Sequence, residues 1–323
     1  MKVGIIGAGA IAGTMAGTIK EMDCAQNYAV AARDYERAAE FAKTYGFEKA
    51  YGSYEELVED TEVELVYIAT PHSHHYEHIK LCLNHGKHVL CEKSFTVNES
   101  QAREVLEMAR EKKLLLTEAI WTRYMPMRKT LDDVLSIGVI GRPYMLTANL
   151  GYIISGKERI MRPELAGGAL LDVGIYPLNF ASMVFGDEVE SITGTAVMTE
   201  TGVDAQNSIT ITYKDGRMAV LCSSAMGLSD RRGIIYGDNG FIEVENINNC
   251  EAIKVYDRSR NLIASYDTPK QISGYEYEVE ACLRAIREGA LECPEMPHEE
   301  TLRMMRWMDE LRRQWGLVYP MEK

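Results

Sequence analysis

The sequence lacks the features that mark several large classes of protein. Its 35 Lys and Arg residues are outnumbered by 48 Asp and Glu, which gives a formal net charge of −13. A bulk partner such as nucleic acid or an anionic membrane requires a basic face, so neither is expected. No run of about 18 apolar residues is uninterrupted, so no membrane span is expected either.

Cysteine spacings typical of metal or disulfide scaffolds are also missing. The seven cysteines are scattered and are never spaced C-x-x-C, which argues against a disulfide framework or a zinc site. The N-terminal MKVGIIGAG has only a short apolar run broken by glycines, unlike a signal peptide. We therefore expect reduced thiols, no metal and a cytoplasmic location.

What the sequence does contain is a change of rhythm near residue 120. A chain of 323 residues exceeds the size at which single cores usually stop growing, so we expect two domains, 1–119 and 120–323. In the first, short apolar runs alternate with helical segments, which predicts a parallel, doubly wound sheet of the Rossmann type. The expected strands are 2–6, 28–32, 63–69, 88–91 and 114–117.

The second part has the pattern of an antiparallel sheet. The run SITITY at 208–213 alternates strictly, and Asp-Gly at 215–216 and Asn-Gly at 239–240 have the composition of hairpin turns. We expect several such strands between 144 and 266, with helices near 123–137, 175–185, 275–288 and 298–313. The predicted fold class is therefore α/β: a Rossmann domain, then an α+β domain with a large, mostly antiparallel open sheet.

A dinucleotide-binding loop follows the first expected strand. The motif G-x-G-x-x-A is formed by Gly7, Gly9, Ala10, Ile11 and Ala12 with their neighbours. The first glycine permits the tight turn, the second lets backbone approach a pyrophosphate, and the small third residue lets helix and strand pack closely. The start of the following helix supplies amide donors and a positive dipole.

The end of the second strand decides which dinucleotide is preferred. An acid at this place binds the ribose 2′-hydroxyl of NAD, whereas an arginine accommodates the 2′-phosphate of NADP. Here the strand ends in Arg33 and Asp34, with Arg37 four residues after Arg33. Both guanidiniums can pair with a phosphate, which favours NADP over NAD. Asp34 is the dissenting residue, and it could instead cap the next helix.

Four of the seven histidines lie in one segment. Thr70 and Pro71 precede His72, Ser73, His74 and His75, and His78 follows. His74 and His78 have the i, i+4 spacing of a metal-binding helix face, but no Cys, Asp or Glu completes a familiar set. We expect His72 and His75 to line the cofactor pocket or to cap the following helix.

Two further groups are candidates for the active site. Glu92 and Lys93 follow the strand at 88–91, at the edge of a parallel sheet where ligands bind. A lysine there can reach a reacting hydroxyl, although an isolated Glu-Lys pair is more often a solvated surface pair. Trp121 and Arg123 lie where the chain leaves the first domain, and Trp121 either walls the nicotinamide or substrate pocket or is a buried interdomain residue.

These residues resemble the glucose–fructose oxidoreductase / inositol dehydrogenase family, also written Gfo/Idh/MocA. Its G-x-G-x-x-A/G, T-P-x-x-x-H and E-K-P motifs correspond to 7–12, 70–75 and 92–94. Within the family, the chain is most similar to the branch of dimeric dihydrodiol dehydrogenases and NADP-dependent D-xylose dehydrogenases. The matching segments are AARD (31–34), YGSYEEL (51–57), GKHVLCEKS (86–94), EAIWTRY (118–124), GGALLDVGIYPLNF (167–180) and SMVFG (182–186).

The resemblance implies a homodimer formed through the open sheet of the second domain. It also implies that Lys93 and Tyr176 match the catalytic positions and that Arg33 and Arg37 contact the 2′-phosphate. Ser94 departs from the usual proline of the E-K-P motif, and Tyr176 stands where many relatives carry histidine. The cofactor contacts expected on this basis are the glycine loop, the two arginines, Thr70, Pro71, His72, His75, Glu92, Lys93, Trp121 and Arg123.

The predicted reaction is oxidation of a hydroxyl group of a sugar or small diol. A tyrosine with an ordinary pKa of about 10 is a poor base near neutrality, and a nearby ammonium lowers that pKa. Tyr176 is therefore the expected acid–base group, with Lys93 tuning it and hydrogen-bonding the substrate. Direct proton donation by Lys93 is the alternative division of roles.

The surroundings of Tyr176 suggest further substrate contacts. Asp172, Tyr176 and Asn179 have the spacing of one helix face. Pro177 belongs in a first helical turn, so the helix should start near Gly174, with Asp172 as its cap or as a substrate ligand. Trp121 is the remaining expected substrate contact.

Two other functions remain open on the sequence alone. One is a nicotinamide-dependent glycosidase, in which transient oxidation assists glycosidic cleavage. The other is a non-catalytic NADP-sensing regulatory protein, although such a protein has no need of an acid–base pair.

Overall fold

The computed structural model describes residues 1–322, which form two compact units. The first comprises Met1–Tyr124 and Gln271–Met305, and the second comprises Met125–Lys270 and residues 306–322. Residues 271–305, assigned to the second domain in the sequence analysis, thus lie in the first unit. Hydrogen bonds join them to the edge of its sheet: the Leu116 amide donates to the Leu291 carbonyl (3.2 Å), and His298 Nε2 lies 2.8 Å from the Leu116 carbonyl.

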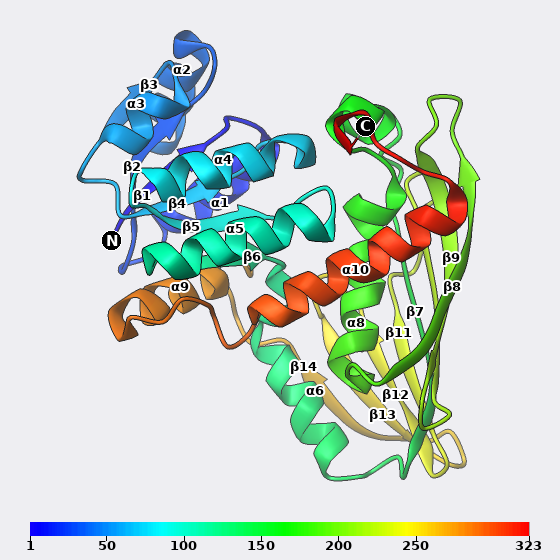
Figure 1. Cartoon of the computed structure of the whole chain (residues 1–323). Coiled ribbons are helices and arrows are strands. Elements are labelled where there is room, and N and C mark those ends of the chain that lie inside the picture. Colours follow the sequence, from blue (N-terminus) through cyan, green and yellow to red (C-terminus); the bar gives the residue numbers. More distant parts are fainter. Residues whose placement is uncertain (323) are drawn as a thin grey trace. The chain divides into compact units, whose positions relative to one another are not determined.

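The first unit is built on a parallel sheet, as expected from the alternation of strands and helices (Figure 1). The strand order is β3-β2-β1-β4-β5-β6, so the direction of progression reverses between β1 and β4. Parallel strands are covered on both faces, which accounts for their continuous apolar runs. The strands are β1 (Lys2–Ile6), β2 (Gln26–Ala31), β3 (Lys49–Tyr51), β4 (Leu65–Ile68), β5 (His88–Glu92) and β6 (Leu116–Ala119).

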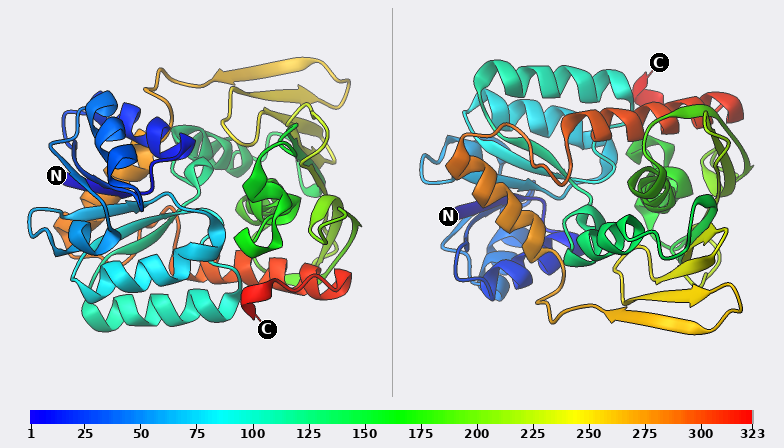
Figure 2. Two further views of the ribbon diagram at one scale, coloured as in Figure 1. Left: turned by 90° about the horizontal axis from the view of Figure 1, so that it is seen from above. Right: turned by 90° about the horizontal axis from the view of Figure 1, so that it is seen from below.

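Helices cover both faces of this sheet. From β1 to β3 the chain adds strands in one direction along the sheet, and from β4 to β6 it adds them in the other. Because crossovers between parallel strands are right-handed, the helices of the two series lie on opposite faces of the sheet. Figure 2 shows two helices of the second group, α4 and α5, side by side. The first group is α1 (Ala10–Lys20) and α2 (Tyr35–Tyr45); the second is α3 (Tyr54–Glu59), α4 (His72–Asn84) and α5 (Glu99–Lys112); α9 (Glu276–Glu288) packs on β5.

Two helices of this unit begin with side-chain caps. The Ser53 side chain accepts a hydrogen bond of 3.2 Å from the Glu56 amide at the start of α3. The Asn98 side chain accepts one of 2.9 Å from the Gln101 amide at the start of α5. Each cap satisfies an amide that the first helical turn leaves without a backbone partner.

The second unit contains an eight-stranded sheet that is antiparallel except between β7 and β10 (Figure 1). This confirms the predicted mostly antiparallel sheet. Asp215-Gly216 forms the turn between β9 and β10, with Gly216 at φ +85°. The strands are β7 (Pro143–Gly151), β8 (Val189–Met198), β9 (Asp204–Tyr213), β10 (Met218–Ser224), β11 (Gly233–Gly237), β12 (Gly240–Glu245), β13 (Ala252–Asp257) and β14 (Leu262–Asp267).

One face of this sheet packs against α8 (Ile175–Phe185) and the π-helical turn Leu170–Gly174 before it. Side chains alternate across the strands, so Leu221 and Ser223 are buried on this face while Cys222 is exposed on the other. The remaining helices are α6 (Pro126–Ser136), α7 (Glu158–Met161) and α10 (His298–Trp315), within which the division between the units falls.

One helical stretch, Pro163–Phe185, is long and apolar enough to cross a membrane by length and composition. Of its most apolar window, 89% is buried inside the protein. A core helix passes the same test, so this stretch is weak evidence for a membrane span.

Candidate functional site

The loop between β1 and α1 has the geometry of a phosphate-binding turn. Gly7 has φ +106°, and a Cβ there would lie 2.9 Å from the carbonyl oxygen of Ala69. Gly9 is the extended N-cap of α1, and a Cβ at that position would meet no atom within 4 Å. Ala12 is fully buried where helix and strand meet. The loop therefore leaves space in front of the amides that begin α1, which fits a dinucleotide pyrophosphate.

The residues after β2 surround this loop with positive charge. Asp34 is the N-cap of α2 and accepts a hydrogen bond of 3.1 Å from the Arg37 amide, which confirms the capping role considered for it. The Arg37 guanidinium donates to the Ala8 carbonyl at 2.8 Å, within the glycine loop itself. Arg33 is exposed and, within residues 1–322, has neither a hydrogen bond nor an ion pair. Its charge is available for an anion.

The histidine segment begins α4. His75 is buried, with Nδ1 at 2.9 Å from the Ser94 carbonyl and Nε2 at 2.8 Å from the Thr70 carbonyl. Burial lowers the pKa of His75 to about 4, so the imidazole is neutral near pH 7. The residue links the loops after β4 and β5. Pro71 is the N-cap, so the capping role considered for His72 and His75 is wrong.

The possible metal pair in this segment has other contacts. His78 Nδ1 lies 3.0 Å from the Thr70 hydroxyl, and its ring lies 5.8 Å from that of His74. Among residues 1–322, no three His, Cys, Asp or Glu side chains come together as a metal-binding group.

Lys93 directly follows β5, at the edge of the sheet that carries the glycine loop. It is half-buried, and its peptide bond to Ser94 is cis. Glu92 is buried, accepts a short hydrogen bond from the Tyr67 hydroxyl and lies 3.2 Å from the Lys93 amide. Glu92 is thus engaged inside the protein, and its contacts fix the backbone at Lys93.

Two buried carboxyl groups near this point escaped sequence reasoning. Glu278 of α9 is fully buried, and burial, together with the neighbouring Glu92, raises its pKa well above the ordinary value. Glu118 of β6 accepts a hydrogen bond from the Phe95 amide, and burial raises its pKa to about 7. No motif or spacing singles out Glu278, because it is separated from β5 by almost two hundred residues.

Trp121 and Arg123 lie in a single 3₁₀ turn, Trp121–Arg123. The Trp121 ring stacks on Tyr275, with centroids 4.2 Å apart and an angle of 17°. Arg123 is buried in an ion pair with Glu300 at 2.6 Å. The partners Tyr275 and Glu300 both come from the segment that completes the first unit, and neither was expected.

The second unit carries Tyr176 in the first turn of α8. The helix starts beside Gly174 as expected, but the chain is already helical before it, through a π turn closed by a hydrogen bond from the Ile175 amide to the Leu170 carbonyl. Asp172 lies inside this turn, so its predicted capping role is wrong. Pro177 lacks an amide hydrogen and its ring would clash with the carbonyl four residues earlier in a regular helix, which the π turn avoids.

The predicted neighbours of Tyr176 are all buried. Asp172 forms an ion pair of 2.5 Å with Arg159, which the sequence analysis did not identify. Asn179 is fully buried and donates to the Ile175 carbonyl at 2.9 Å. Tyr176 is 7% exposed. Acid, base and phenol groups thus gather around the start of α8.

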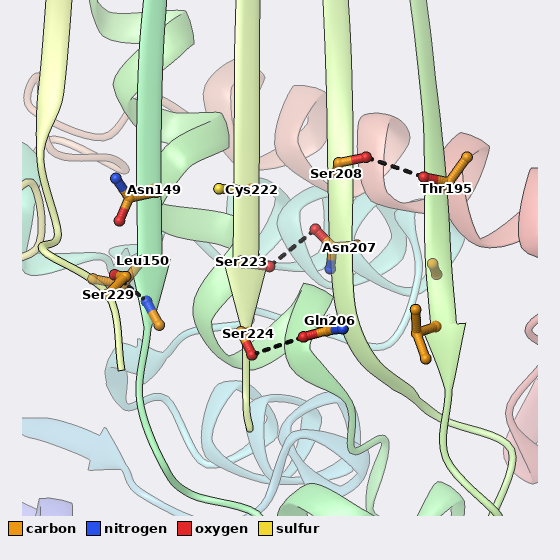
Figure 3. Close-up of a pocket in the computed structure, with 13 residues that line it drawn as sticks. Asn149, Leu150, Thr195, Gln206, Asn207, Ser208, Cys222, Ser223, Ser224 and Ser229 are labelled. Carbon is orange, nitrogen blue, oxygen red and sulfur yellow. Dashed lines mark hydrogen bonds between the residues drawn. The ribbon is translucent and has the colours of Figure 1, made fainter. Parts of the chain in front are cut away.

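A cavity of about 420 Å³ lies elsewhere, across the strands β7, β10, β9 and β8 (Figure 3). Hydroxyl and amide groups line it and bond to one another, as in the pairs Ser223–Asn207 (3.0 Å) and Thr195–Ser208 (3.0 Å). None of the residues predicted for the active site is among its lining residues.

Comparison with known proteins gives matches over almost the whole chain. Residues 1–120 match the Gfo/Idh/MocA oxidoreductase family, NAD-binding Rossmann fold, and residues 129–243 match the Gfo/Idh/MocA C-terminal domain. Trans-1,2-dihydrobenzene-1,2-diol dehydrogenase of Xenopus tropicalis is 34% identical over 99% of each chain. The human enzyme of the same name is 34% identical over 100% of this chain and 99% of its own.

Solved structures agree with these sequence matches. A 3-ketoreductase from Actinomadura kijaniata, in complex with NADP and TDP-benzene, superposes with a TM-score of 0.90 at 25% identity, over 97% of each chain. The expectation drawn from the motifs is confirmed. With a nicotinamide-type Rossmann domain, a matching C-terminal domain and full-length relatives, this chain belongs to the Gfo/Idh/MocA family of oxidoreductases.

Proposed function

We propose that this chain is an NADP-dependent dehydrogenase that oxidises a hydroxyl of a sugar or trans-diol, or reduces the matching carbonyl. The observation that carries the proposal is the environment of Lys93, at the sheet edge that bears the glycine loop, with its backbone fixed by Glu92. The full-length similarity to trans-dihydrodiol dehydrogenases supports the substrate class.

The cofactor is held by the edge of the parallel sheet in this proposal. The amides at the start of α1 bind the pyrophosphate, and Gly9 gives it room because no side chain projects there. Arg33 and Arg37 bind the 2′-phosphate, which distinguishes NADP from NAD. His75 holds the Thr70 and Ser94 loops on either side of the nicotinamide end.

In this proposal, Lys93 and Tyr176 act on the same substrate hydroxyl. A nicotinamide held by these residues would supply the acceptor for the hydride that leaves the carbon bearing the hydroxyl. Tyr176, as phenolate, takes the hydroxyl proton, and a carbonyl remains. The Lys93 ammonium favours the phenolate and hydrogen-bonds the substrate oxygen. The proton then passes from Tyr176 to water, which restores the phenolate for the next turnover.

The test is turnover by the purified protein with NADP⁺ and either trans-1,2-dihydrobenzene-1,2-diol or D-xylose, followed through NADPH absorbance. We expect NADPH formation with at least one of them, and its loss in Tyr176→Phe and Lys93→Ala. Near-wild-type turnover of Tyr176→Phe overturns the assignment of the acid–base group. Glycoside cleavage without net NADPH would indicate a glycosidase, and cofactor binding without any turnover a regulatory protein.

We also propose a homodimer formed through the sheet of the second unit. Directly paired residues place a row of apolar side chains across five strands on one face: Met218, Met145, Tyr236, Phe241 and Tyr256. Met145 and Met218 are 37% and 39% exposed, and Phe241 stacks on Tyr256 at 4.5 Å. A continuous apolar row that is exposed or half-buried is typical of an interface, and a second copy presents the same row. Light scattering should give twice the chain mass, reduced to the monomer in Met145→Glu.

A further inference from the structure

The proposed function does not use two histidines of α4, His74 and His78. His74 and His78 lie on α4, which follows β4, and Arg33 follows β2. These two strands flank β1, so both connections lie beside the glycine loop at the same sheet edge. Burial lowers the pKa of the His74 and His78 imidazoles, and the Arg33 guanidinium is close enough to lower both further.

The cluster around Arg33 is held together by contacts among rings. The Tyr54 and His78 rings meet edge to face with centroids 4.6 Å apart, and the His74 ring lies 5.8 Å from that of His78. His78 is fixed on its other side by Thr70. His74 is the half-buried member at the open end of this row, next to Arg33.

Within residues 1–322, no carboxylate is among the groups that shift the pKa of His74 or His78. Arg33 acts on both imidazoles, and His74 and His75 act on His78; none of these groups is acidic. The pKa of Tyr54, on α3, is raised by burial and by Glu55 and lowered by Arg33 and Arg37. Glu55 does not act on the two imidazoles. A guanidinium without an ion pair, beside imidazoles on which no acid acts, forms a site for an anion.

We propose that His74, together with Arg33, binds the 2′-phosphate of NADP, so that cofactor selectivity depends on protonation of His74. This rests on the proposed use of NADP and adds a second selectivity residue to it. The 2′-phosphate is the part of NADP that differs from NAD, and it carries close to two negative charges above about pH 6.5.

The sign of the pH effect follows from the charges. Without cofactor, burial and then Arg33 lower the pKa of His74 below 6.5, so the imidazole is neutral near pH 7. A phosphate dianion beside it favours the imidazolium, so binding of NADP takes up a proton. Affinity for NADP therefore rises as the pH falls from about 8.5 to about 6.5, up to about tenfold per pH unit at full coupling. Affinity for NAD has no such dependence.

The experiment is calorimetric titration of the full-length protein with NADP⁺ and with NAD⁺ at both ends of this pH range. Repeating it in two buffers of different ionisation enthalpy gives the number of protons taken up per cofactor bound. The variants are His74→Gln, which cannot be protonated, and His74→Lys, which carries a permanent charge. His85→Gln is the matched control, because His85 is an exposed histidine at the other end of α4.

We expect wild type and His85→Gln to take up a proton with NADP⁺ and to prefer it more strongly at low pH. His74→Gln should lose both effects, and His74→Lys should keep the preference at every pH without proton uptake. That rescue would not follow from a purely structural role. If wild type prefers NADP⁺ and a folded His74→Gln keeps the same proton uptake and selectivity, this inference alone is overturned. A wild-type protein that does not prefer NADP⁺ overturns the proposed cofactor and this inference together.

Discussion

The Arg37 guanidinium donates a hydrogen bond of 2.8 Å to the Ala8 carbonyl and thereby ties the start of α2 to the glycine loop. Arg33, four residues earlier, has no such tie. The two arginines expected to bind the same phosphate thus differ in what their loss removes.

Replacing each arginine separately should reveal this difference. Arg33→Ala should weaken NADP⁺ binding by tenfold to about a hundredfold, the range for a charge-assisted hydrogen bond, and leave NAD⁺ binding nearly unchanged. Arg37→Ala should weaken both cofactors, because it also releases the glycine loop. Titration followed by tryptophan fluorescence measures the four affinities. Equal effects of Arg33→Ala on NADP⁺ and NAD⁺ would contradict its assignment to the 2′-phosphate.

Gly9→Ala separates cofactor binding from folding. A Cβ at Gly9 meets no protein atom within 4 Å and its φ of −97° suits alanine, so the melting temperature should stay near that of wild type. The added methyl lies where the pyrophosphate approaches, so cofactor affinity should fall by at least about tenfold. Gly17→Ala is the matched control in the same helix, also with nothing within 4 Å, and should bind cofactor normally. Normal binding by Gly9→Ala would show that the loop does not hold the pyrophosphate.

The roles of Lys93 and Tyr176 differ in their pH signatures. Tyr176→Phe removes the acid–base group, and the turnover rate should fall by about a hundredfold to ten-thousandfold at every pH. Lys93→Ala removes the ammonium that favours phenolate, so the rate should fall and its rise with pH should move to higher pH. The pH dependence of kcat with a substrate that wild type turns over measures both. A pH profile that keeps its position in Lys93→Ala would favour Lys93 as the direct proton donor.

Glu118 makes stability depend on pH. Burial raises its pKa from 4.5 to about 7, so the folded protein binds the proton more tightly than the unfolded chain. The free energy of unfolding therefore includes a contribution from protonated Glu118, on the order of 3 kcal/mol in the limit. This contribution is fully present below about pH 4.5 and is lost as the pH rises through about 7. Glu118→Gln keeps an acceptor for the Phe95 amide and should melt higher than wild type at pH 8. If the melting temperature of Glu118→Gln fell more steeply between pH 5 and pH 8 than that of wild type, this explanation would be contradicted.

The parts of the fold that local patterns determine were predictable. The glycine loop, the caps at Ser53 and Asn98, and the parallel sheet all depend on residues close together in the chain. The partners of Trp121 and Arg123 were not, since Tyr275 and Glu300 approach only after the chain returns to the first unit. Periodicity gives no information about such distant pairs.

The surroundings of Tyr176 illustrate a different limit. Helical spacing predicted one face for Asp172, Tyr176 and Asn179, and all three are buried; Pro177 correctly marked the start of α8. A π turn, however, has no sequence signature in hydrophobic periodicity, and so Asp172 was expected as a cap instead of a partner of Arg159. The substrate contacts of these groups stay a prediction.

The return of residues 271–305 to the first unit affects how this protein can be made and divided. On the ribosome, β5 is synthesised long before α9, whose Val279 and Cys282 are buried when the unit is complete. The first unit cannot finish folding until Met305 has been synthesised, when only about a twentieth of the polypeptide remains to be translated. A fragment that stops at residue 119 would expose the surface that α9 covers, so residues 1–119 alone do not make a complete domain that can be transferred to another protein. Chimaeras with other dehydrogenases must exchange both segments together.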